Sequence, residues 1–590
     1  MKLNKFSLAI LLGLGAFTAC NDELDVTNPN QQTTGTFGFT SDDLEECVIA
    51  AYNHTRMEGT FARVGYLYDV SRGDEVYNTS PNEWYTPYDE MTASYALEYT
   101  QWPWRDWYYT INVCNFVISR TGQDSDENLT EKMRRVKGQV LFLRGLSYYT
   151  LVNYYQNPIL ITDYNTYSSL SGLYGTNSTY SEVLAQCVSD FRRALELLPS
   201  KTAGGEWAGG RATNGAAAGY LARALMQQHN YNEALTWLKK IIAGDYGTYK
   251  LMPRYGDNFR EGTAYENNDE SLYEVQFLDY GTQGTDDEWT PVNTSAYATQ
   301  GSAVESNFGP GDYGGWADLA ASPWLYKLFK AERTTDGKLD PRLYWTLGTF
   351  ESDWTDSYPE GGFGNMCYTD QMTADDPVVV NTAWGGIPIA KWTNFRTGLY
   401  NKVVTGLHDG INLRLMRYSD VLLRAAECIN EISGPTDEAI GYINQVRNRA
   451  NLASLPTTGW TPDSLFEQIA NVERPKEFGC EHGRGHDLIR WGWFYAKDRL
   501  TQLKQHGTYR RTTVKTQAFE NVTYEMALSD PLIVSTFDQY QEGHEFIPIY
   551  QGNLNDNPNL KGNSANYDSS NRDSITWTIH PVVSSIGINE

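Results

Sequence analysis

The sequence predicts a mainly α-helical fold in which paired helices carry a second part that is irregular and rich in loops. Apolar residues recur at three- and four-residue spacing through several stretches, the pattern of helices with one buried face. Two of these stretches continue through a short turn into a second stretch of the same kind. Long stretches dense in Gly, Asp, Asn and aromatic residues lack this spacing and include extended runs such as 271–277.

The first residues have the pattern of a secretory signal peptide. Lys2 and Lys5 give a basic start, an apolar run covers 6–17, and small residues precede Cys20. The run is too short to cross a bilayer. The cysteine at the expected cleavage point resembles a bacterial lipobox, so we expect removal of residues 1–19 and lipid attachment to Cys20. More than one acyl chain on that residue would hold the protein stably on a membrane.

Helix patterns begin after this polar, turn-rich start. A first helix is predicted from about residue 41, where the serine and aspartates at 41–43 supply capping oxygens. Further helices are predicted at 102–119, 131–155 and 181–198, each with apolar residues on one face.

Two later blocks have the pattern of helix pairs joined by tight turns. The first covers 212–242 with its turn at 229–232, and the second covers 413–450 with its turn at 433–436. Small residues at the facing positions let two helices approach closely, as in tetratricopeptide-like hairpins. An array of helical hairpins is therefore the predicted scaffold.

No Pro- or Ser-rich linker divides the mature chain, so we predict one domain over 20–590. Its helical scaffold would cover about 41–243 and 411–500. The irregular stretches would form an insert at about 244–410 and a C-terminal segment at about 501–590. Loops of this length in a compact protein are usually functional or carry small structure of their own.

Charge and cysteine content exclude some classes of function. The formal net charge is −26, which argues against nucleic acid or an anionic lipid surface as the ligand, because both attract positive charge. Seven cysteines occur without a CxxC pair or regular spacing. Those in helical patterns are expected to be isolated buried thiols, not a disulfide framework. They are Cys47, Cys114, Cys187 and Cys428.

Six motifs follow one another along the chain. They are CNDELD at 20–25, LRGLSYYTLV at 143–152, RATNGAA at 211–217, LRLMRYSDVLLRAAE at 413–427, ERPKEFGCEHGRGHDLIRW at 473–491, and FIPI with NPNLKGN at 546–563. Together they resemble the SusD/RagB family of outer-membrane nutrient-binding lipoproteins over nearly the whole chain. His482 departs from the family pattern, in which glycine is usual.

The resemblance implies a fold and a function. The fold is a SusD-like α-α superhelix of tetratricopeptide-like helix pairs with an irregular, loop-rich ligand-binding subdomain. The function is capture of oligosaccharide or polysaccharide at the cell surface by a lipoprotein anchored in the outer membrane through Cys20. Such a protein delivers the glycan to a SusC-like TonB-dependent transporter and is not an enzyme. Alternatives are capture of peptide or glycoprotein by the same machinery, a surface glycoside hydrolase, and a helical adaptor without a ligand.

Sugar recognition needs a flat apolar ring face together with polar groups that bond hydroxyls. In the family, ligand contacts come from the segment after the first helix and from loops of the irregular part. Aromatic residues beside Asn, Asp and Arg occur in both regions of this chain, whereas Trp107, at helical spacing, is expected to be core. The candidate ligand residues are Asp74, Asn82, Trp84, Tyr85, Trp289 and Trp316.

Other chemistry has weaker support. Cys480, His482 and His486 have a zinc-like spacing, but only three ligands are present, and the charged residues at 477–490 explain the stretch as a network that ties helices together. Acidic pairs at 286–288 and 375–376 are adjacent in sequence, so their side chains do not converge on one bond as glycosidase carboxylates must. Calcium at 266–270 or 286–288 is an alternative to a solvated loop, but neither has EF-hand spacing. No catalytic residue, metal ligand or cofactor is predicted.

Overall fold

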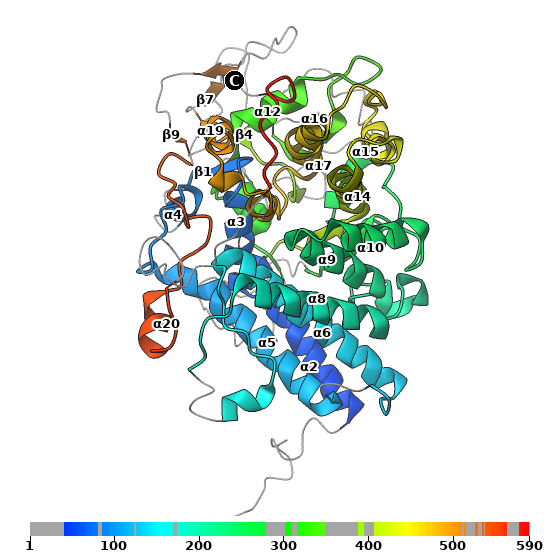
Figure 1. Cartoon of the computed structure of the whole chain (residues 1–590), viewed down its shortest axis with the longest axis vertical. Coiled ribbons are helices and arrows are strands. Elements are labelled where there is room, and N and C mark those ends of the chain that lie inside the picture. Colours follow the sequence, from blue (N-terminus) through cyan, green and yellow to red (C-terminus); the bar gives the residue numbers. More distant parts are fainter. Residues whose placement is uncertain are drawn as a thin grey trace, which may run out of the picture.

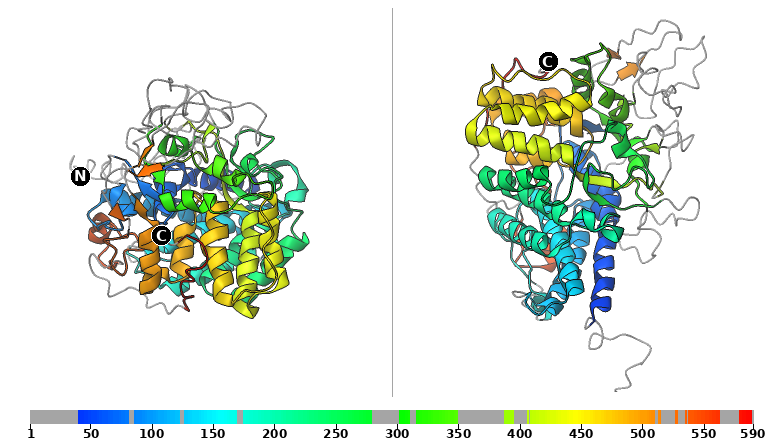
Figure 2. Two further views of the ribbon diagram at one scale, coloured as in Figure 1. Left: turned by 90° about the horizontal axis from the view of Figure 1, so that it is seen from above. Right: turned by 90° about the vertical axis from the view of Figure 1, so that its right-hand side faces the viewer.

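The computed structural model is mostly helical. It describes residues 40–80, 85–122, 126–168, 174–278, 301–309, 315–348, 387–394, 406, 408–509, 512–514, 526–528, 534–535, 537–562 and 578–588. Helices stack in antiparallel layers along one side of the molecule, and the chain between α10 and α14 lies along the other side (Figures 1 and 2). No helix in the described ranges is long and apolar enough to cross a membrane.

The stacked helices follow one another in sequence. They are α2 (Ser41–His54), α5 (Gln101–Thr121), α6 (Glu131–Tyr155), α8 (Tyr180–Leu197), α9 (Asn214–Gln227), α10 (Tyr231–Ala243), α14 (Tyr418–Ser433) and α15 (Asp437–Arg449). Short helices follow: α16 (Pro462–Gln468), α17 (Arg474–Phe478), α18 (Arg484–Arg490) and α19 (Lys497–His506). The predicted hairpins correspond to α9 with α10 and to α14 with α15.

Local sequence sets the helix ends. The Thr40 hydroxyl accepts a hydrogen bond from the Asp43 amide at 3.1 Å, and the Asp43 carboxylate accepts one from the Thr40 amide at 3.2 Å. Helix α10 ends at Gly244, whose φ of 86° is readily adopted only by glycine. Helices α6 and α8 pack closely because Gly145 has no side chain, since a Cβ there would lie 2.8 Å from the Phe191 ring.

One predicted helix start is wrong. Residues 413–417 were expected to begin a helix, but Leu413–Arg417 is the strand β5, and α14 begins only at Tyr418. Strand β5 pairs antiparallel with β2 (Ser271–Val275), with Val275 opposite Leu413. The predicted extended run at 271–277 is therefore confirmed over Ser271–Val275, and its backbone hydrogen bonds hold 413–417 in the extended form.

A three-stranded sheet joins the segment after the first helices to the irregular part. Its strands are β1 (Val76–Asn78), β3 (Leu319–Ala321) and β4 (Ile387–Pro388), in the order β1-β3-β4. The register of β1 against β3 places Val76 opposite Ala321. Three short helices flank β3 in the sequence: α11 (Val304–Phe308), α12 (Pro323–Lys330) and α13 (Pro341–Thr346). This sheet positions the candidate site.

Candidate functional site

Pairing of β1 with β3 brings together two of the predicted ligand residues. Tyr85 precedes the short helix α4 (Thr86–Asp89), and Trp316 precedes β3. The amides of Thr79 and Ser80 both donate to the Asp318 carbonyl, at 2.9 and 3.2 Å. The chain leaving β1 therefore lies beside the chain entering β3.

Arg63 lies between the two aromatic side chains. Its guanidinium carbon is 4.7 Å from the centroid of the Trp316 ring, and the group also hydrogen bonds the Tyr85 hydroxyl. That hydroxyl donates to the Asn307 side-chain oxygen at 3.1 Å. We call Tyr85, Trp316 and Arg63 the aromatic shelf. Tyr85 is buried and Trp316 is only partly buried, so Trp316 is the ring of the shelf that reaches the surface.

The charged groups Arg63 and Asp318 at the shelf are buried. Asp318 is 1% exposed, and burial raises its pKa to about 6, although a hydrogen bond from Ser80 and the charge of Arg63 act in the opposite direction. Burial alone would lower the pKa of Arg63, but Tyr85 and Glu58 more than offset it. In the described part of the chain, the Oδ2 atom of Asp318 has no hydrogen-bond partner.

Asp74 lies elsewhere, in a fully buried ion pair. Arg484 donates from Nε to Asp74 Oδ1 at 2.7 Å and from a terminal nitrogen to Oδ2 at 2.9 Å, and His506 Nδ1 lies 2.7 Å from Oδ2. Burial alone would raise the pKa of Asp74, but Arg484 and His506 hold it well below its usual range. A carboxylate enclosed in this way offers no accessible oxygen to a ligand, so we assign Asp74 to the scaffold.

The remaining predicted site residues lie outside the described residues. They are Asn82, Trp84 and Trp289. Cys20, the predicted site of lipid attachment, also lies outside the described residues. Trp107 is 1% exposed, which confirms it as core. Sequence reasoning missed Arg63, although a cation inside the mostly apolar run at 61–70 was a signal that could have identified it.

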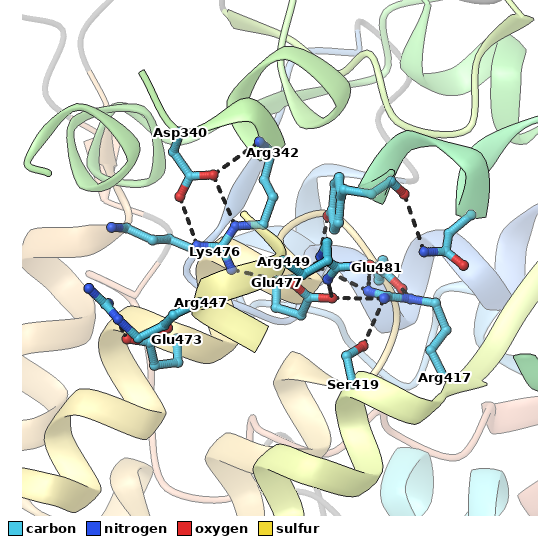
Figure 3. Close-up of polar contacts among 12 residues, drawn as sticks. Asp340, Arg342, Arg417, Ser419, Arg447, Arg449, Glu473, Lys476, Glu477 and Glu481 are labelled. Atoms are coloured by element: carbon cyan, nitrogen blue, oxygen red, sulfur yellow. Dashed lines mark hydrogen bonds and ion pairs between the residues drawn. The ribbon is translucent and has the colours of Figure 1, made fainter. Parts of the chain in front are cut away.

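The charged stretch that follows α16 forms the predicted network between helices (Figure 3). Glu477 accepts hydrogen bonds from Arg417 at 2.8 Å, Arg449 at 2.5 Å and Arg342 at 3.3 Å. Glu481 in turn accepts from Arg417 at 2.7 Å. All of these side chains are buried, including that of Arg449, which is 4% exposed. Together they connect α17 with β5, α15 and α13.

The zinc-like residues in this stretch have separate partners. Cys480 is buried, His482 lies 3.3 Å from Arg223, and His486 lies 3.3 Å from Asp69. Within the described ranges, no group of three or more His, Cys, Asp or Glu side chains is arranged to hold a metal ion. The arrangement therefore gives the stretch a structural role.

The calcium alternative at 266–270 is also explained by protein contacts. Glu270 accepts hydrogen bonds from Arg417 at 2.7 Å and from the Met252 amide at 2.8 Å. Glu266 accepts one from the Asn412 amide at 3.1 Å. Protein donors, including Lys250 at 2.9 Å from Asp269, therefore account for these carboxylates without a metal ion; 286–288 lies outside the described residues.

The five cysteines in the described residues are all free and buried, which confirms the predicted buried thiols. They are Cys47, Cys114, Cys187, Cys428 and Cys480. Burial raises the pKa of the Cys47 thiol to about 11, helped by nearby Glu46 and Asp43. These thiols pack as small apolar groups.

Comparison with known proteins gives the same assignment as the motifs and the helical array. Residues 269–567 match the model of the SusD family, and residues 22–226 match a model described as starch-binding, associating with the outer membrane. The chain belongs to the SusD family. A SusD-like protein of Formosa agariphila, P25, is 24% identical over 518 residues, which cover 83% of this chain and 90% of that protein.

Solved structures of the SusD type share the fold. A SusD superfamily protein from Bacteroides vulgatus has a TM-score of 0.66 at 23% identity, covering 90% of this chain and 100% of that one. A surface glycan-binding protein A from Bacteroides thetaiotaomicron, solved in complex with laminarihexaose, has a TM-score of 0.62 at 20% identity, covering 89% and 99%. The predicted mainly α, SusD-like superhelix is confirmed.

Proposed function

We propose that this SusD-family chain is a glycan-binding lipoprotein of the outer membrane that captures oligosaccharide or polysaccharide at the cell surface. Cys20 carries the lipid, the aromatic shelf contacts the sugar, and a SusC-like TonB-dependent transporter receives the glycan. The chain binds the glycan without cutting it. The observation that carries the proposal is the convergence of Tyr85 and Trp316 on Arg63, with the Trp316 ring at the surface.

The shelf has the chemistry that a sugar requires. An indole ring offers a flat apolar face to the C–H side of a pyranose, and nearby polar groups fix its hydroxyls. Arg63 supports Trp316 from one side, which limits the motion of the ring and so reduces the entropy lost on binding. The net charge of −26 disfavours polyanionic ligands over long range, so a neutral glycan is the preferred class.

The relatives support this choice. The surface glycan-binding protein from Bacteroides thetaiotaomicron shares the fold over most of both chains and was solved in complex with laminarihexaose. Family membership also favours binding over catalysis, because relatives in the comparison are described as binding proteins. Asn82, Trp84 and Trp289 remain candidate ligand contacts from the sequence.

Affinity electrophoresis tests the proposal. The folded protein is run through native gels containing neutral polysaccharides, among them laminarin and starch, or charged polysaccharides, with a gel lacking polysaccharide as the reference. We expect retardation in at least one neutral gel and no reducing sugar released from that polysaccharide. If the protein migrates unretarded in every gel and binds peptide or glycoprotein, the ligand is a peptide or glycoprotein and the glycan proposal is wrong. Release of sugar would instead support a hydrolase.

Delivery to a transporter has its own test. A tagged full-length chain is expressed in its native outer membrane and purified in mild detergent. We expect a TonB-dependent barrel protein to co-purify in comparable amount, and a variant with Cys20→Ala to lose the membrane anchor. Purification without any barrel protein would argue against the delivery step and would leave glycan binding untouched.

A further inference from the structure

The last described segment, 578–588, is a strap that crosses helices from both parts of the molecule. It contacts α14, α16 and α19 of the helical part and α12 of the irregular part. At its far end, the Trp324 indole of α12 donates a hydrogen bond to the Ile588 carbonyl at 2.9 Å. This end of the chain lies beside α12 and α16 in Figure 1, at the end of the molecule opposite the start of α2.

A single histidine fixes the near end of the strap. His580 Nδ1 lies 2.7 Å from a carboxylate oxygen of Asp463, and Nε2 lies 2.8 Å from a carboxylate oxygen of Glu431. A neutral imidazole has one N–H and can donate to only one of these carboxylates. The imidazolium has two and satisfies both. The geometry on both sides of the ring therefore fits the protonated form.

The strap is held at the same place by contacts that do not depend on this proton. The His580 ring stacks on Phe466, with centroids 4.2 Å apart and planes 15° from parallel. Arg499 donates to the carbonyls of His580 and Pro581 at 2.9 and 2.8 Å. These contacts keep the ring between its two carboxylates, so gain or loss of its proton acts directly on the attachment.

We propose that His580 is a proton-dependent latch that closes the C-terminal strap over α14 and α16 when both ring nitrogens are protonated and releases it when the proton is lost. Release would expose the surface of these helices under the strap. Loss of the proton leaves one ring nitrogen as an acceptor facing a carboxylate, two groups that repel each other.

The charges around the ring set the direction of the pH effect. Glu431 faces it from α14 and Asp463 from α16, while α19 contributes Arg499 and Asp498. The charge of Arg499 is neutralised by Glu467, whose carboxylate lies 2.6 Å away, and the contact from α12, made by the uncharged Trp324, is to the far end of the strap at Ile588.

Burial lowers the pKa of His580, but Glu431 and Asp463 more than offset it, so the pKa lies above its usual value. The attachment is therefore fully present below the unfolded pKa of about 6.5 and is lost as the pH rises through the raised pKa.

Hydrogen exchange read by mass spectrometry tests the latch on the full-length protein between pH 5.5 and 9, with rates corrected for intrinsic exchange. For peptides within 578–588 we expect the equilibrium constant for opening of the strap to increase roughly tenfold or more as the pH rises through the titration. This factor corresponds to the loss of one hydrogen bond to a charged group. In His580→Gln the opening equilibrium should be at least as large as that of the wild type at high pH, and it should not change with pH. In Asp498→Asn, which weakens the bond to the Val582 amide at 3.4 Å but leaves both carboxylates of the latch in place, the strap should loosen and still titrate.

Two results would overturn the latch. One is wild-type protection of the strap that stays constant over the whole pH range. The other is a titration in His580→Gln that matches the wild type. Peptides from α6 serve as the internal reference, because a latch leaves their protection unchanged and a general loss of folding does not.

Discussion

Replacing Asp74 by Asn should destabilise the fold and leave glycan affinity unchanged. The substitution keeps the size of the side chain but removes the charge that faces Arg484 and His506 in a fully buried site. Breaking a buried ion pair from one side costs about 3–5 kcal/mol, because the remaining cation is left without a counter-charge. Asn retains one acceptor oxygen, so we expect the free energy of unfolding to fall by an amount at the lower end of this range, about 3 kcal/mol.

Guanidinium unfolding of wild type and Asp74→Asn measures this loss, and Asp269→Asn is the control. Asp269 pairs with Lys250 at 2.9 Å on the surface, where both side chains are more than half exposed, so its loss should cost at most about 1 kcal/mol. Because the pKa of Asp74 is depressed, its contribution should be present at neutral pH and fade as the pH falls below about 4. Equal stabilities of Asp74→Asn and Asp269→Asn, or weaker glycan binding by folded Asp74→Asn, would refute this reasoning.

Three further predictions follow from other buried groups. Glu477→Ala leaves Arg342, Arg417 and Arg449 short of an acceptor and should lower the free energy of unfolding by about 3–5 kcal/mol in the same denaturant assay. The pKa of Asp318 is raised to about 6, so its contribution to stability is fully present below about pH 4 and is lost as the pH rises through 6. In Asp318→Asn the free energy of unfolding should therefore change less with pH between about 4 and 6. The buried thiols should not react with a thiol reagent until guanidinium unfolds the chain, and rapid reaction of the native protein would contradict their burial.

Local patterns predicted the long scaffold helices well, because the information that forms such a helix lies within it, but they did not predict the short helices α11, α12 and α13 in the irregular insert. The expected helix at 131–155 matches α6, Glu131–Tyr155, since Thr130 caps it and apolar residues fill its buried face. The start of α14 was missed for the opposite reason. Residues 413–417 are held in the extended form by β2, a strand far away in the sequence, and no local signal records that pairing.

The site was predictable only in part, for the same physical reason. Side-chain chemistry suggested Tyr85 and Trp316 as ligand residues, and the structure shows that both contact Arg63, while their role as ligand residues stays a prediction. The same chemical reasoning also suggested Asp74 as a ligand residue. The structure assigns it to the scaffold, because its carboxylate pairs with Arg484, 410 residues further along the chain, and the sequence alone does not show this pairing. Long-range pairing decides whether a polar residue serves a ligand or the scaffold.

Isothermal titration of a Trp316→Ala variant tests the central claim most directly. The titrant is an oligosaccharide of whichever polysaccharide retards the wild type. Trp237→Ala is the matched control, since Trp237 is also partly buried with a cation over its ring, Lys240 Nζ at 4.4 Å from the centroid, but lies on α10. Loss of a central aromatic contact costs about 2 kcal/mol or more, so the Kd of Trp316→Ala should rise roughly 30-fold while that of Trp237→Ala stays at the wild-type value. Equal affinity of Trp316→Ala and wild type would show that the sugar binds elsewhere.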